Sequence, residues 1–291
     1  MFWLSKKHIA ILLMLPALLL YVLYIIIPII MAFFYSFTKF SGIGEPEFVG
    51  LKNYARLLKD PLFLVSLKNT FIILAVSFVL LLVGSFLLAV LLNTKIKGAN
   101  AAKALIFSPA IIAPIVVGLI WSFILDPYTG LINMFLEKGG LDFLALKWIG
   151  GVTLTPYVVG VVYTWQVLGF ITTIFIAGLK LIPQNIYEAA SIDGANPRQE
   201  LFFITIPMLK QTFLINVVLI ITGCFKIFEV VFQLTGGGPN HLSEVLVTYM
   251  YNTSFQYSEY GYGMSIAVVT FLLSIMFFSV YLLVIMKRKE E

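Results

Sequence analysis

Four polar side chains recur three or four positions apart in an otherwise apolar segment of the chain: Thr222, Lys226, Glu229 and Gln233. At about 100° per residue, one helix would bring all four within about 60° of one another as a polar stripe. Lys226 and Glu229, three residues apart, could then form an ion pair. Charges in such apolar surroundings serve either as the lining of a polar path or as a pairing between packed helices. The residue types leave both roles open.

Sequence motifs for catalysis are lacking. No G-x-x-x-x-G-K-[ST] phosphate-binding loop occurs, so the chain alone is not expected to bind and hydrolyse ATP. The two histidines, His8 and His241, do not form an H-E-x-x-H zinc motif, and no serine nucleophile elbow is present. We therefore expect neither an enzyme nor a cofactor or metal ion held by this chain.

A second polar stretch, "EAASIDGANPRQELFFITIP", runs over residues 188–207. Pro183 suits a first helical turn, and the residues after it favour a helix until Gly194, which supplies a flexible or positive-φ position. Asn196 then fits a helix N-cap, with Gln199 three residues later as in a capping box. The pattern predicts helix, sharp turn, helix over about 183–207. Local chemistry alone is equally consistent with an ordinary capped surface loop.

Composition indicates the elements that must hold these residues. Hydrophobic residues are 60% of the chain and charged residues 11%, whereas a soluble domain is about a quarter charged. A helix crosses a hydrocarbon layer of roughly 30 Å with about 20 apolar residues, and it satisfies its own backbone groups. Six segments meet this requirement and predict one all-α integral membrane domain over residues 1–291: 9–34, 69–92, 105–125, 155–179, 212–234 and 264–286.

The first of these segments is also the place where a secretory signal would stand. Its apolar run far exceeds the core of such a signal, about 7–15 residues, and no A-x-A-like cleavage site follows it, so a membrane span is favoured. Cys224 is the only cysteine, which excludes an intramolecular disulfide.

Basic residues predict the orientation in the membrane, because cytoplasmic loops retain Lys and Arg. The N-terminus, the second and fourth connections and the C-terminus together hold eleven basic and five acidic residues. The other side holds seven basic and eight acidic residues. Both termini and the 183–207 segment are therefore expected in the cytoplasm. The net charge of +5 is a topology signal, and no nucleic-acid partner is expected.

The 188–207 stretch resembles the EAA loop of ABC importer permeases, whose pattern is E-A-A, three residues, G, nine residues, then I-x-L-P. The match is carried by Glu188, Ala189, Ala190, Gly194, Ile204 and Pro207. Only Ile206 departs, standing where the family has Leu. In that family the loop is cytoplasmic, between the fourth and fifth of six helices, and the predicted spans place it there in this chain.

Two outer segments are similar to carbohydrate-uptake permeases of the maltose and glycerol-3-phosphate type. They are "FVGLKNYARLLKDPLFLVSLKNT" after the first predicted span, and "LTGGGPN" with a later "YGYG" before the last. The resemblance implies a permease subunit of a binding-protein-dependent ABC importer for a sugar. An oligosaccharide is favoured, and glycerol-3-phosphate or another small polar solute is the alternative.

The resemblance also implies partners. They are a second permease subunit, expected to be a different chain, two ATPase subunits that bind ATP and Mg²⁺, and an extracytoplasmic solute-binding protein. The chain would be a multi-pass protein of a bacterial or archaeal plasma membrane. The short helix carrying Glu188 would dock in a cleft of the ATPase, and Gly194 would set the angle between the two short helices.

Aromatic residues on the predicted fourth span complete the candidate sites. Tyr163, Trp165 and Phe170 can stack on sugar rings, although aromatic side chains in membrane helices also pack or anchor. Tyr163 and Phe170 join the four polar residues as candidates for a translocation path. A different class of function stays open: an ion-gradient-driven secondary carrier with Lys226 and Glu229 as its coupling site. A non-transporting scaffold is the third possibility.

Overall fold

A computed structural model describes residues 7–94, 98–151 and 153–287. The only strands in these ranges are the two-residue strands β1 (Thr38–Lys39) and β2 (Glu47–Phe48), which pair antiparallel. The chain forms two compact units. The first takes the chain up to Asp60 together with Tyr249–Leu272, and the second takes Pro61–Thr248 and the chain from Leu273 onward.

The first unit begins with one long apolar helix. It consists of α1 (Lys7–Tyr21), a π-helical turn (Val22–Ile26) and α2 (Ile27–Ser36). Pro16 lies inside α1, as a membrane helix tolerates where the freed backbone groups find other partners. The apolar part, Leu13–Ser36, is long enough to cross a membrane, in the place where the sequence predicts the first span.

The rest of the first unit joins the end of that helix to the start of the last one. The β1–β2 hairpin and α3 (Lys52–Leu57) follow α2. The end of α14 (Leu246–Tyr251), from Tyr249 onward, and a π-helical turn (Asn252–Gln256) precede α15 (Tyr260–Lys287), which belongs to this unit up to Leu272. The amide of Gly261 donates to the carbonyl of Phe40 at 3.1 Å. A side chain at position 261 would collide with the Thr38 carbonyl, so glycine permits this close approach.

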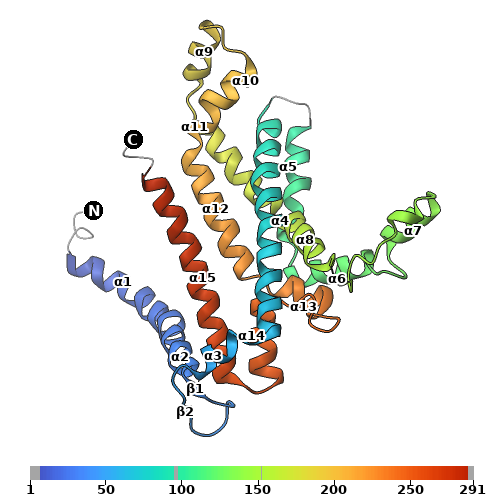
Figure 1. Ribbon diagram of the computed structural model, residues 1–291. Coiled ribbons are helices and arrows are strands. Elements are labelled where there is room, and N and C mark those ends of the chain that lie inside the picture. The colour runs from blue at the N-terminus through green and yellow to red at the C-terminus, as the bar shows by residue number, and fades with distance from the viewer. Residues whose placement is uncertain (1–6, 95–97, 152, 288–291) are drawn as a thin grey trace. The chain divides into compact units, whose positions relative to one another are not determined.

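The second unit is built on three helices that pack together: α4 (Pro61–Leu92), α8 (Thr155–Lys180) and α12 (Lys210–Phe225). Figure 1 shows α9 and α10 at one end of this unit, and α6, α7 and α13 towards the other. Small residues allow the backbones to approach, because a Cβ on Gly160 of α8 would press against Val76 of α4. Phe175 of α8 contacts Phe86 and Phe213 with ring centroids 5.6 and 4.8 Å apart.

The predicted third span is not one straight helix. Its residues form α5 (Ala99–Phe107), a 3₁₀ turn (Ser108–Ile111) and α6 (Pro114–Ile124), and the axis turns by 99° at the break. Pro114 has no N–H to continue a helix and drives the residue before it into an extended conformation. Ala113 accordingly has ψ of 134°. The prediction of a continuous helix over 105–125 is therefore wrong.

The predicted fifth span is also interrupted. The helical segment Pro197–Met208 meets α12 at a 66° bend, and α12 ends at Phe225. A separate helix, α13 (Glu229–Thr235), follows after Phe228, whose φ and ψ are −133° and −64°. The prediction of one helix over 212–234 is wrong for this reason.

Four helices of the described ranges are long and apolar enough to span a membrane: Leu13–Ser36, Pro61–Leu92, Thr155–Lys180 and Tyr260–Ser279. The number rises to six if each bent pair counts as one span. α4 and α15 begin at Pro61 and Tyr260, earlier than the sequence-based bounds of 69 and 264. The connection between α6 and α8 carries α7 (Leu131–Lys138) and a 3₁₀ turn (Asp142–Leu144).

Candidate functional site

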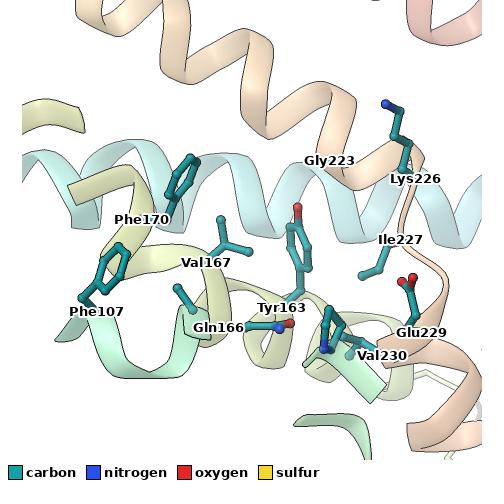
Figure 2. Close-up of a pocket in the computed structure, with 12 residues that line it drawn as sticks. Phe107, Tyr163, Gln166, Val167, Phe170, Gly223, Lys226, Ile227, Glu229 and Val230 are labelled. Atoms are coloured by element: carbon teal, nitrogen blue, oxygen red, sulfur yellow. The ribbon is translucent and has the colours of Figure 1, made fainter. Parts of the chain in front are cut away.

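An open pocket of about 330 Å³ lies in the second unit, where the breaks in the third and fifth predicted spans both meet α8 (Figure 2). The lining comes from α5, the 3₁₀ turn, α6, α8, α12 and α13. The residues are Phe107, Ala110, Pro114, Tyr163, Gln166, Val167, Phe170, Gly223, Lys226, Ile227, Glu229 and Val230. Helix breaks of this kind are found where membrane proteins bind solutes, since irregular backbone is tolerated at membrane depth only when it is buried or lines a cavity.

The break after the 3₁₀ turn is stabilised by Gln166. This side chain is 5% exposed, and its Nε2 donates to the carbonyl oxygen of Ile112 at 3.1 Å. The bond satisfies a carbonyl that a continuous helix would have paired within itself. One residue of α8 thus both lines the pocket and holds the shape of the neighbouring broken span.

The break after α12 separates the two charged candidates. Lys226 is the C-cap of α12 and Glu229 is the first residue of α13, so they do not share a helix. Both side chains are exposed and line the pocket. In the part of the chain that the structure describes, no ion pair joins them. The predicted continuous stripe is therefore wrong, because the helix ends between the two residues. Of the two roles left open by the sequence, pairing between Lys226 and Glu229 does not occur.

Tyr163 crosses the pocket from α8 towards α12. Figure 2 shows its hydroxyl pointing at the α12 backbone near Gly223. A Cβ at position 223 would collide with that hydroxyl oxygen, so glycine there makes room for the tyrosine. Glycine at position 223 therefore lets the Tyr163 hydroxyl come close to the α12 backbone.

The structure brings together four of the six residues proposed for a path. Tyr163, Phe170, Lys226 and Glu229 all line the pocket. Thr222 does not line it, and its hydroxyl donates to the Val218 carbonyl within α12 at 2.8 Å.

Gln233 and Trp165 have packing roles instead. A Cβ on Gly118 of α6 would press against the Cβ of Gln233, so α6 and α13 cross closely there. Trp165 stacks edge-to-face on Trp121 with ring centroids 5.4 Å apart. For Trp165 the packing alternative is the one that the structure shows.

Sequence reasoning missed Phe107, Gln166 and the α5–α6 break. Pro109 and Pro114 were the available signal, because prolines that interrupt an apolar segment point to a discontinuous helix. The α12 break carries no such mark, since neither proline nor glycine occurs over residues 224–229.

The second candidate site is the polar segment that links α8 to α12. It contains α9 (Gln184–Ile192), α10 (Pro197–Gln199), a π-helical turn (Glu200–Thr205) and α11 (Ile206–Met208). Gly194 has φ of +82°, and Asn196 forms a complete capping box with Gln199. The predicted helix, turn and second helix are confirmed, with Pro183 as the N-cap just before the first helix.

Side-chain hydrogen bonds hold α9 against the segment that follows. The Tyr187 hydroxyl lies 3.0 Å from Oγ1 of Thr205, and Ser191 Oγ donates to Glu200 at 3.3 Å. Among the six residues of the EAA pattern, Glu188, Ala189, Gly194 and Pro207 are exposed, while Ala190 and Ile204 are half-buried.

Large apolar side chains are also exposed on this polar segment. Ile192, Phe202 and Phe203 are 86%, 61% and 77% exposed. Exposed apolar side chains gathered on a polar segment are typical of a surface that binds another protein.

The chain belongs to the family of binding-protein-dependent transport system inner membrane components, whose family model matches residues 70–290. It is a transport subunit of a multi-pass membrane type rather than an enzyme. It is 36% identical to the probable ABC transporter permease protein YurN of Bacillus subtilis, over 93% of this chain and 94% of the relative. It is 34% identical to the arabinooligosaccharides transport system permease protein AraP of Bacillus subtilis, over 91% and 84%.

A solved structure has the same fold. One chain in a crystal structure of a bacterial alginate ABC transporter superposes with a TM-score of 0.80, covering 96% of this chain and 94% of its own, at 21% identity. In the described ranges, no group of three or more His, Cys, Asp or Glu side chains could hold a metal ion.

Proposed function

We propose that this chain is a permease subunit of an ATP-driven, binding-protein-dependent importer for an oligosaccharide. The observation that carries the proposal is the meeting of two helix breaks at one pocket in a chain of this family. Relatives such as AraP carry names that refer to sugar transport, and they match over most of the chain. The EAA-type segment between α8 and α12 supports ATP coupling.

The pocket has the chemistry of a sugar path. Tyr163 and Phe170 offer aromatic faces, on which the C–H faces of sugar rings stack. Lys226 and Glu229 offer an exposed donor and acceptor that are not tied to one another. One cation and one carboxylate balance in charge, which favours a neutral solute over glycerol-3-phosphate.

The coupling surface is the exposed face of α9 with the residues beyond it. Glu188 and Ala189 are exposed at the EAA pattern, and Ile192 offers an apolar anchor. In this proposal α9 docks on an ATPase subunit that binds ATP and Mg²⁺, and Gly194 fixes the direction of α9 relative to α10. A second permease chain, a second ATPase subunit and an extracytoplasmic binding protein complete the importer, with both termini in the cytoplasm.

Transport in reconstituted vesicles tests the proposal. The complete importer should take up radiolabelled oligosaccharide only when ATP is present on the ATPase side and loaded binding protein is present on the other. Uptake that needs a proton or sodium gradient and ignores ATP would select a secondary carrier. Absence of flux with every energy source would select a scaffold.

The substrate class needs a separate measurement. Mass spectrometry of the ligand retained by the purified binding protein identifies the solute without relying on this chain. A panel of neutral oligosaccharides, including arabino-oligosaccharides, and glycerol-3-phosphate then serves in the uptake assay. Preferential uptake of glycerol-3-phosphate would contradict the neutral-sugar assignment while leaving the importer intact.

A further inference from the structure

A second pocket, of about 340 Å³, lies within the first unit and is unrelated to the candidate sugar path. Its lining comes from the β1 strand and the residues after it, from α3, and from the start of α15. Three of the lining side chains are cations, Lys39, Lys52 and Arg56, and one is a carboxylate, Glu259. The pocket therefore carries an excess of positive charge.

The cations differ in how far they are already neutralised. Arg56 forms an ion pair with Glu259 at 2.8 Å, and its guanidinium carbon lies 3.9 Å from the centre of the Tyr262 ring. Lys39 and Lys52 are exposed and have no ion-pair partner in the described part of the chain. Glu47 lies opposite Lys39 in the hairpin, but it does not line the pocket. Two ammonium groups are thus available to a ligand.

The walls of the pocket are rigid. Asn53 Nδ2 donates to the carbonyls of Ser36 and Thr38, both at 2.9 Å, which fixes α3 to the end of the first span. The hydroxyl of Tyr262 donates to Asp60 at 2.5 Å, which fixes the end of the same segment to α15. The backbone positions from which Lys39 and Lys52 extend are therefore set by folded structure, in β1 and α3.

The residues that line the pocket lie next to the ends of two apolar spans, which indicates a position at the boundary of the membrane. Lys39 follows the first apolar span by three residues, since that span ends at Ser36. Ser258, Glu259 and Tyr262 flank Tyr260, where the last span begins. The end of the first span and the start of the last span both lie at this pocket within one unit, so the depth expected for it is that of the lipid headgroups.

Apolar side chains beside the pocket also face outward. Ile43, Phe48, Leu51 and Leu58 are 90%, 73%, 66% and 76% exposed. A surface that alternates such residues with lysines is typical of an element that lies in the membrane interface, with its apolar side chains among the acyl chains. The end of a membrane span on either side of the pocket favours a lipid over a soluble partner as its occupant.

We propose that this pocket binds the phosphate group of an anionic lipid headgroup, with Lys39 and Lys52 as its ligands and the ion-paired Arg56 as its inner wall. Basic pockets beside membrane helices recognise anionic headgroups through the attraction between Lys or Arg and the lipid phosphate. The bound lipid would hold the first and last spans together at their shared end.

The test uses the full chain assembled with its importer subunits in phosphatidylcholine vesicles. Electron paramagnetic resonance measures how much spin-labelled phosphatidylglycerol is immobilised by the protein, relative to spin-labelled phosphatidylcholine. The wild type should prefer phosphatidylglycerol. The Lys39→Gln/Lys52→Gln variant should lose preference by about fivefold for each lysine removed, the factor expected for one surface cation near an anionic lipid.

Matched variants separate the pocket from general charge and from misfolding. Lys59→Gln/Lys68→Gln removes the same charge outside the pocket, from the second residue ahead of α4 and from the first turns of α4, and it should keep the wild-type preference. Lys39→Arg/Lys52→Arg should keep it too, because the cations remain. An equal loss of the preference for phosphatidylglycerol in both glutamine variants would overturn the proposed site, since the total charge of the protein would then explain the preference.

Two further results would also overturn the proposal. In the first, inorganic phosphate protects Lys39 from acylation in the solubilised protein, while the protein in vesicles shows no lipid preference. The ligand would then be a soluble anion. Unchanged lipid preference in Lys39→Gln/Lys52→Gln with weakened affinity for the binding protein would make the pocket a protein contact. Each result is read from binding, so failure here is distinct from failure of sugar transport.

Discussion

The side-chain amide of Gln166 on α8 donates to the backbone carbonyl of Ile112 at the break between the 3₁₀ turn and α6, with an N to O distance of 3.1 Å. The donor is 5% exposed, so solvent cannot readily replace it. A sharp bend in an apolar segment is therefore stabilised by a neighbouring helix.

Replacing Gln166 with Leu should destabilise the protein by about 1–3 kcal/mol, because the partly buried Ile112 carbonyl would lose its donor. The midpoint of thermal unfolding of the detergent-solubilised importer is the measurement. Thr164→Val is the control, since the Thr164 hydroxyl only donates to the Gly160 carbonyl within its own helix. An equal fall of the unfolding midpoint in both variants would contradict a special role for Gln166.

Gly223→Ala should lower stability and transport together, because the new methyl group would collide with the Tyr163 hydroxyl. Tyr163→Phe removes that hydroxyl, so the double variant should recover part of the loss. A double-mutant cycle on the unfolding midpoint should give a coupling free energy within about 0.5–3 kcal/mol. A coupling of zero would show that the two side chains do not meet.

Gly194→Val should uncouple ATP hydrolysis from transport if α9 docks on the ATPase. At φ of +82° a β-branched residue is strained by roughly 1–2 kcal/mol, although its Cβ would meet nothing within 4 Å. The matched control is Gly194→Asn, since asparagine tolerates this backbone region. Stimulation of the ATPase by loaded binding protein should fall in the valine variant and persist in the asparagine variant. Normal ATPase stimulation in both variants would show that the segment is an ordinary surface turn.

The turn after α6 should depend on pH through Asp126. Hydrogen bonds from the backbone N–H groups of Thr129 and Tyr128, and then from the Thr129 hydroxyl, lower the pKa of its carboxyl below the ordinary value. A carboxyl whose pKa is lower in the folded state than in the unfolded state stabilises the fold at pH values above its unfolded-state pKa. This stabilisation is lost as the pH falls through the folded-state pKa.

Amide hydrogen exchange at Tyr128 and Thr129 measures this effect. Protection should fall at acidic pH, after correction for the intrinsic pH dependence of exchange. Asp126→Asn keeps an acceptor oxygen but does not titrate, so its corrected protection should not change with pH. A wild-type profile identical to that of Asp126→Asn would show that the carboxylate is not what holds the turn.

Orientation is tested with single cysteines at positions 240 and 198 in a Cys224→Ser background. Asn240 and Arg198 are both exposed, so either position can react with a membrane-impermeant maleimide. The cysteine replacing Asn240 should react in intact cells, and the one replacing Arg198 only after the membrane is opened. The reverse pattern would place the 183–207 segment outside the cell and exclude its coupling to a cytoplasmic ATPase.

The long helices could be predicted from the sequence because their apolar runs are continuous. α8 (Thr155–Lys180) matches the predicted span 155–179 almost to the residue. The turn at Gly194 could also be predicted, since glycine, Asn196 and Gln199 determine it through local hydrogen bonds. In both cases the residues within a few positions contain the required information.

The pocket could be predicted only in part. Tyr163, Phe170, Lys226 and Glu229 were identified by residue type, but a continuous helix was assumed for the last two. Hydropathy averages over a window, so it does not show that α12 ends at Phe225. Gln166 acts through a residue 54 positions earlier in the chain, and such a contact depends on tertiary packing.

The two helix breaks also give the pocket a mechanical property. Bending a continuous helix disrupts hydrogen bonds of its ladder, but Ala113 and Phe228 already have non-helical backbone conformations. Rotation about these residues changes the angle of α6 or α13 without breaking a helical ladder. α8 has no such break and is one continuous helix from Thr155 to Lys180. One wall of the pocket is therefore a continuous helix, whereas α6 and α13 each begin at a break beside the pocket, and the break before α6 is held by Gln166.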